Sequence, residues 1–280
     1  MRLFMLFALV LASAADVAAQ APELTAAQRQ WVAAHRVVRV APDADLAPID
    51  AVDAGGHQVG LSADYLKLIS TRSGLEFRTQ RLPSRADALS ALRAHRIDLV
   101  AATVAEDDQG IAFSAPYLRL SAAIYARSGE PGFTSLEQLA GHSVGVVETS
   151  PWPRLVSIQS GTTKLSRFAD IGAALRALRD KSIDAYIGDP FTTADALGRL
   201  KFDKDVTLSG ELALVAPLSF AVRGDWPMLR EIIDAALKSI SVDDEKTLRE
   251  RWLKNASIPA AGASATATAN VLPPSHAPAI

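Results

Sequence analysis

Three consecutive acidic residues at 106–108 follow an apolar run at 99–104 and precede a second apolar run that begins at Ile111. Carboxylates in such a place could bind a metal cation, repel an anion, or decorate a solvated loop. Adjacent acids alone are weak evidence for a metal, because metal ligands converge from several positions. An unpaired buried carboxylate is costly, so we favour the solvated loop.

Two stretches share the pattern A-L-x-A-L-R-x-x-x-I-D, at 88–98 and at 174–184, which places the copies 86 residues apart. In each copy, apolar residues at helical spacing precede a short basic linker and then a second apolar run. This order predicts a helix followed by a strand, with the strands at 99–103 and 185–189. The repeat therefore predicts two similar α/β lobes.

The repeat also points to a ligand site, because ligands of open α/β sheets bind beyond the carboxyl ends of the strands. Five residues beyond the Asp of each copy stand Thr103 and Asp189. If the lobes face each other, these two residues line one cleft from opposite sides. Asp189 precedes Pro190, and Asp-Pro commonly starts a turn, so a turn role for Asp189 stays open.

A second candidate site lies at Thr149 and Ser150, where the strand expected at 142–148 ends. Both side chains are able to cap a helix, and Pro151 suits the first helical position. Free N–H groups at such a helix terminus attract anions. Ordinary capping is the alternative interpretation.

The remaining pattern alternates strands and helices, which implies mostly parallel sheets covered on both faces. Helix 60–74 ends at a glycine, and helix 135–141 begins near Thr134 or Ser135. The other expected elements are strands at 37–43, 75–82 and 218–227 and helices at 228–239 and 242–253.

Bulk composition narrows the function classes. The 280 residues are 49% hydrophobic with a net charge of −2, so no basic field indicates nucleic acid. The absence of cysteine excludes disulfides and thiolate metal sites. No paired histidine spacing indicates a metal, no nucleophile motif is present, and His142 is expected at the surface. We expect no cofactor.

Both ends of the chain differ from the folded region. Arg2, an apolar run at 3–11 and small residues at 18–21 predict a cleaved signal peptide over 1–21, with a membrane anchor as the alternative. This predicts a periplasmic protein. Residues 257–280 are rich in Ala, Thr, Ser and Pro and predict a disordered tail.

Six segments in order resemble the extracellular solute-binding protein family 3, which includes periplasmic amino-acid receptors and venus-flytrap sensor domains. They are residues 60–69, 88–100, 111–118, 135–147, 174–189 and 218–237. The resemblance implies a type II periplasmic binding protein with lobe 1 at 36–121 plus 217–256 and lobe 2 at 122–216. It implies crossings near 120–125 and 213–219 and a monomer that binds a small polar solute and works with a membrane permease or sensor partner.

The resemblance also implies binding residues. Asp189 matches the acid that pairs with the ligand ammonium, and Ser150 with Thr149 matches the carboxylate site. Ala101, Ala102 and Thr103 match the small residues that end the lobe 1 strand. Leu46 occupies the place of a stacking aromatic.

The acidic stretch at 106–108 departs from the family pattern. Family receptors carry a carboxylate-binding Arg where this chain has the acids at 106–108, and no Arg occurs between Arg96 and Arg119. Such acids favour a cation, an amine or a neutral polar ligand over a carboxylate. Arg85 and Arg119 are candidate replacements.

The sequence thus predicts a receptor for a small polar, amino acid-like or amine solute, serving ABC-type uptake or signalling. One alternative is a cyclohexadienyl or prephenate dehydratase-like enzyme, which the missing Arg disfavours because its substrate is a dianion. The other is an adaptor that has lost its ligand and binds a protein partner.

Overall fold

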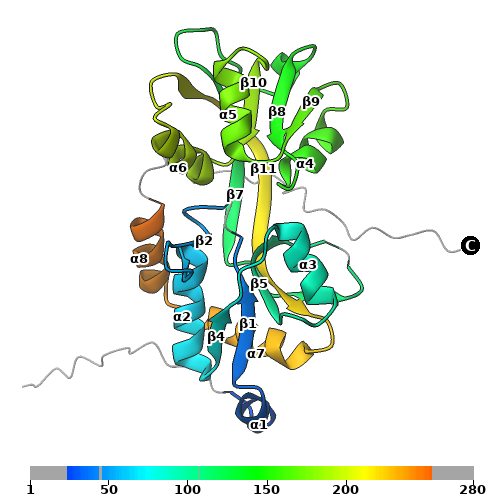
Figure 1. Cartoon of the computed structure of the whole chain (residues 1–280), viewed down its shortest axis with the longest axis vertical. Coiled ribbons are helices and arrows are strands. Elements are labelled where there is room, and N and C mark those ends of the chain that lie inside the picture. Colours follow the sequence, from blue (N-terminus) through cyan, green and yellow to red (C-terminus); the bar gives the residue numbers. More distant parts are fainter. Residues whose placement is uncertain (1–23, 44–45, 107, 254–280) are drawn as a thin grey trace, which may run out of the picture.

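Two α/β lobes lie end to end and are joined by two long strands (Figure 1). This computed structural model describes residues 24–43, 46–106 and 108–253. The predicted signal peptide and tail lie outside these residues. Within the described ranges, no helix combines the length and the apolar character that a membrane crossing requires.

The sheet of lobe 1 centres on β1 (Val37–Ala41), which pairs in parallel with β4 (Glu76–Thr79) and β5 (Leu99–Val104). Beyond β5 lies an antiparallel strand, β11 (Val206–Arg223), and β6 (Ile111–Phe113) pairs with its end. A small hairpin, β2 (Ala51–Val52) and β3 (Gln58–Val59), follows β1.

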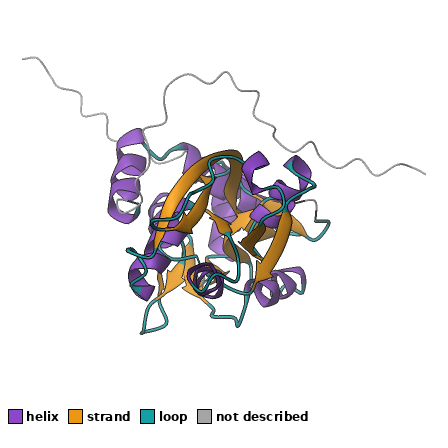
Figure 2. Cartoon of the chain, turned by 90° about the horizontal axis from the view of Figure 1, so that it is seen from above, coloured by secondary structure: helices purple, strands orange, loops and turns teal. Residues whose placement is uncertain are grey.

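Helices cover both faces of this sheet. Seen along the long axis of the molecule, helices lie on both sides of the strands (Figure 2). Helices α2 (Leu61–Ser73) and α7 (Pro227–Lys238) bury apolar side chains on one face, whereas α3 (Arg85–Arg93) covers the other. Helix α8 (Val242–Trp252) lies beside α2. Helix α1 (Ala26–Ala34) is anchored by Trp31, whose ring packs edge-on against Trp226.

In lobe 2, β8 (Ser143–Val147) lies between β10 (Ala185–Gly188) and β9 (Lys164–Phe168), all parallel. Helix α4 (Trp152–Gln159) packs on one face, and α5 (Ile171–Arg179) and α6 (Pro190–Leu200) pack on the other. The predicted helix at 135–141 is only a 3-10 turn, η1 (Glu137–Leu139), with no side-chain cap. Thr134 instead donates its N–H to the side chain of Gln138.

Strands β7 (Leu118–Arg127) and β11 pair antiparallel and pass from one lobe into the other. The predicted crossing at 120–125 falls within β7, and the one at 213–219 falls within β11. The strand expected at 218–227 in fact begins at Val206, because the pairing with β7 continues through two irregularities in register. The predicted helices at 60–74, 228–239 and 242–253 are confirmed as α2, α7 and α8.

Candidate functional site

The carboxyl ends of the parallel strands of the two lobes face each other. Strand β7 enters lobe 2 and β11 returns from it, so their antiparallel neighbours β10 and β5 point back toward the junction. Strands β8 and β1 run parallel to β10 and β5, and Figure 1 shows β1 pointing toward lobe 2. The structure therefore brings the candidate residues to two facing edges, which is where such sheets bind ligands.

On the lobe 1 edge, Thr103 and Ala102 end the buried strand β5. Thr103 is 3% exposed, and its Oγ1 has no hydrogen-bond partner within the described residues. The Ala102 carbonyl accepts a hydrogen bond from Nη1 of Arg85 at 3.2 Å. Arg85 also lies 3.5 Å from Oδ2 of Asp43, the second residue after β1. A guanidinium and a carboxylate thus share this edge.

A fully buried carboxylate, Asp50, organises the loop that carries Asp43. Its Oδ2 accepts the N–H of Asp43 at 2.7 Å, and its Oδ1 accepts Nε2 of Gln58 at 2.7 Å. Burial raises the pKa of Asp50 well above its usual value, although both hydrogen bonds oppose this effect. Leu46 forms a backbone bridge with Asp50 and packs on the core. The sequence did not predict a role for Asp43 or Asp50, because lone acids in an irregular loop give no periodic signal.

On the lobe 2 edge, Asp189 is buried and caps α6. Its Oδ1 accepts the N–H groups of Phe191 and Thr192 at 3.0 and 2.9 Å, and its Oδ2 accepts the Thr192 hydroxyl. Burial raises the pKa of Asp189, and these capping bonds oppose the rise. The local role that Asp-Pro suggested is therefore present. Contact between Asp189 and an ammonium group stays a prediction.

Thr149 and Ser150 follow β8, and Asp189 follows the neighbouring parallel strand β10, so all three belong to the same edge of the lobe 2 sheet. The prediction that either side chain caps the next helix is wrong, since Pro151 is the N-cap of α4 and no side chain bonds there. The Ser150 hydroxyl instead donates to the carbonyl of Val147 at 2.7 Å. Pro153 in the first turn has no N–H, so this helix start offers an anion fewer donors than expected.

Asp108 of the acidic stretch lies against the C-terminal turn of α3, whereas Arg85 at the other end of this helix lies at the lobe 1 edge. Asp108 accepts Nε of Arg93 at 2.9 Å and the N–H of Gly110 at 3.0 Å. The bond from Arg93 lowers the pKa of Asp108 below its usual range. Glu106 is exposed, and Asp107 lies outside the described residues. No group of acids and histidines able to hold a metal occurs among residues 24–43, 46–106 and 108–253. The solvated-loop interpretation is confirmed for Glu106, whereas the Asp108 side chain is only 18% exposed and is paired with Arg93.

A cavity of about 340 Å³ lies at one flank of the junction, between α6 and the C-terminal end of α8. Both lobes contribute to its walls, so a change in the angle between the lobes would alter it. The lining residues are Pro48, Phe191, Ala194, Asp195, Gly198, Arg199, Trp252 and Leu253.

Comparison with known protein families shows the family to which this two-lobed chain belongs. The family of bacterial extracellular solute-binding proteins, family 3, matches residues 38–255. The chain belongs to this family. As a family 3 solute-binding protein, it has the type II periplasmic binding protein fold that its topology indicated.

Two kinds of family 3 relatives resemble the chain. The virulence sensor protein BvgS of Bordetella pertussis is 29% identical over 233 residues, which are 82% of this chain and 19% of that protein. The lysine/arginine/ornithine-binding periplasmic protein of Escherichia coli is 30% identical over 193 residues, which are 67% of this chain and 74% of that one. The chain thus spans about a fifth of the length of the sensor relatives.

Solved structures of relatives have the same fold. The periplasmic VFT2 domain of Bordetella pertussis BvgS superposes with a TM-score of 0.76 at 25% identity, over 82% of this chain and 99% of that domain. Family 3 consists of binding proteins and sensor domains and is not typically enzymatic.

Proposed function

We propose that this family 3 protein is a periplasmic receptor that captures a small polar, amino acid-like or amine solute between its two lobes. The bound form would serve an ABC-type permease or a signalling partner in the membrane. The proposed ligand-binding residues are Leu46, Arg85, Ala102, Thr103, Thr149, Ser150 and Asp189.

The observation that carries this proposal is the pair of facing polar edges joined by two strands. A two-stranded connection permits the lobes to rotate about it, and a solute that contacts both edges favours the closed arrangement. The lobe 1 edge offers Arg85 and Asp43. The adjoining Thr103 hydroxyl is buried and has no hydrogen-bond partner among the described residues. The lobe 2 edge offers Asp189 and Ser150.

Relatives support both proposed roles, solute uptake and signalling. The E. coli relative is named for its binding of lysine, arginine and ornithine, which supports an amino acid-like ligand here. BvgS is named as a sensor, which supports signalling. The signal peptide predicted over 1–21 supports a periplasmic location.

Calorimetric titration with amino acids, polyamines and sugars tests the proposal. We expect one class to release or absorb heat, to raise the melting temperature and to reduce the radius of gyration in X-ray scattering. Absence of all three responses across the panel would count against a receptor and would favour the adaptor alternative. Turnover of prephenate, followed by absorbance, would instead support the enzyme.

A further inference from the structure

We infer that Arg85, at the first position of α3, recognises a carboxylate group on the solute and thereby determines the ligand class. This inference rests on the proposed receptor function. It replaces the expectation from the acidic stretch that the cleft prefers ligands without a carboxylate.

The position of Arg85 follows from its helix. Ser84 caps α3 by accepting the N–H of Asp87, which places Arg85 at the helix start beside the carboxyl edge of β5. Strand β1 pairs with β5 only as far as Val100. The Ala102 carbonyl lies beyond this last pair, and Arg85 reaches it. The guanidinium therefore lies where β1 ends, at the edge that faces lobe 2.

Most of the hydrogen-bonding capacity of Arg85 is unused. Nη1 makes both recorded contacts, at 3.2 Å to Ala102 and 3.5 Å to Asp43. Within the described residues, Nε and Nη2 have no hydrogen-bond partner, and neither is among the unpaired atoms sealed from solvent. The side chain is 16% exposed, so its charge is largely desolvated. A guanidinium with two adjacent nitrogens available matches a carboxylate in a bidentate pair.

The charges beside Arg85 disfavour a dianion. The carboxylate of Asp43 lies near the guanidinium, so the two groups together carry little net charge, which disfavours a dianion such as phosphate. Asp50 holds the N–H of Asp43 and so fixes the loop that carries this acid. Of the acids expected to repel a carboxylate, Asp108 is paired with Arg93 at the other end of α3.

The test compares amino acids with the amines that remain after decarboxylation, namely arginine with agmatine, lysine with cadaverine, ornithine with putrescine and histidine with histamine. For wild type, we expect at least one amino acid to bind about 10-fold to 100-fold more tightly than its amine, the range typical of a charged hydrogen-bonded pair. Arg85→Gln should remove this difference by weakening amino-acid binding relative to amine binding by the same 10-fold to 100-fold, and Arg85→Lys should restore part of it.

Arg119→Gln serves as the rival variant, because Arg119 is exposed on β7 between the lobes. A matched control is Arg78→Gln on the edge strand β4. Circular dichroism and urea midpoints establish that each variant folds. Loss of carboxylate preference in the Arg119 variant but not in the Arg85 variant would overturn the inference.

The outcomes separate the two proposals. Equal binding of amino acid and amine by wild type, or preference that survives in Arg85→Gln, overturns the role of Arg85 and leaves a receptor. Failure of wild type to bind any of the eight compounds counts against both proposals. Non-additive losses from Arg85→Gln and from removal of the carboxylate support direct contact.

Discussion

The two copies of the repeat, α3–β5 in lobe 1 and α5–β10 in lobe 2, are the same local structure in two environments. Ser84 and Asp170, 86 residues apart, cap the two helices through bonds to the third residue beyond each cap. After each helix, His95 and Lys181 take left-handed φ values of 57° and 62°. A shared pattern thus produces the same helix, turn and strand start.

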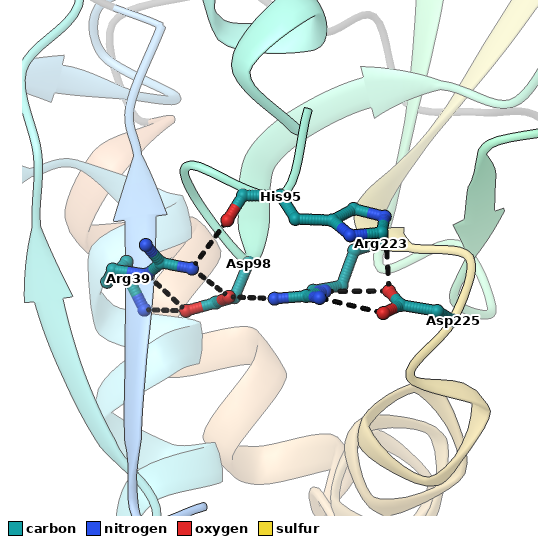
Figure 3. A network of polar contacts seen from close by, with 5 residues as sticks. All are labelled: Arg39, His95, Asp98, Arg223 and Asp225. Atoms are coloured by element: carbon teal, nitrogen blue, oxygen red, sulfur yellow. Dashed lines mark hydrogen bonds and ion pairs between the residues drawn. The ribbon is translucent and has the colours of Figure 1, made fainter. Parts of the chain in front are cut away.

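At the end away from the junction, however, the Asp residues of the two copies differ. Asp98 is 2% exposed and accepts four bonds, from the N–H, Nε and Nη2 of Arg39 and from Nη1 of Arg223 (Figure 3). Asp184 is 43% exposed and accepts the N–H of Ser143 at 2.8 Å, with His142 at 3.5 Å. The strand next to each Asp supplies Arg39 in lobe 1 and Ser143 in lobe 2. The neighbouring strand, and not the repeat itself, therefore determines the charge around each Asp.

At the junction, the copies differ again. Strand β10 ends at Gly188 and α6 follows, so Asp189 is used as a cap. Strand β5 continues to Val104, so the corresponding Thr103 stays within the strand and no helix start uses its hydroxyl. The two equivalent side chains therefore differ in hydrogen bonding: Asp189 accepts bonds from α6, whereas the Thr103 hydroxyl has no partner among the described residues.

The largest expected difference between the copies follows from Asp98. Asp98→Asn should lower the free energy of unfolding by about 2–4 kcal/mol, because two arginines lose a buried countercharge. Asp184→Asn should cost only about 0.5–1 kcal/mol, because its side chain is half exposed. Urea denaturation measures both. Equal losses would show that burial does not separate the copies.

The pH dependence sharpens this contrast. Burial alone raises the pKa of Asp98, but the bonds from Arg39 and Arg223 outweigh it and leave the pKa below its usual value. A lowered pKa in the folded state contributes stability above the unfolded pKa of about 4, and this contribution is lost as pH falls. The stability gap between wild type and Asp98→Asn should therefore narrow between pH 7 and about pH 3. A constant gap would contradict the ionic role.

The next effect concerns the junction. Asp189→Ala should cost about 1–2 kcal/mol, because two N–H groups of α6 and the Thr192 hydroxyl lose their acceptor. Asp189→Asn keeps an acceptor for the helix and should cost less. Thermal and urea unfolding measure both. A larger loss for Asn than for Ala would show that the helix cap is not what Asp189 stabilises.

The smallest effect is expected at the equivalent position of lobe 1. Thr103→Val should change stability by less than about 0.5 kcal/mol, because the hydroxyl that it removes is buried and has no partner in the part of the chain that the structure describes. Thr192→Val is the matched control, since its buried hydroxyl bonds to Asp189 and its loss should cost about 1 kcal/mol. A costly Thr103→Val would reveal a partner for that hydroxyl.

Sequence reasoning succeeded where one local rule governs the backbone. Helix α2 ends at Gly74 with φ of 79°, as a glycine stop predicts. It failed where long-range pairing decides, as in the twelve residues of β11 before Leu218, whose strand conformation follows from pairing with β7. Capping by Ser150 was wrong because α4 begins one residue later, with Pro151 as its N-cap.

The sequence by itself determined the two-lobed α/β organisation, because the repeat encodes apolar periodicity and caps within a few residues of one another. Only the tertiary structure decided the chemistry of the facing edges. Arg85, Asp43 and Ala102 come from three separate segments and meet because β1 and β5 are neighbours in the sheet. Charge pairing between such segments depends on distance in space, which no local pattern records.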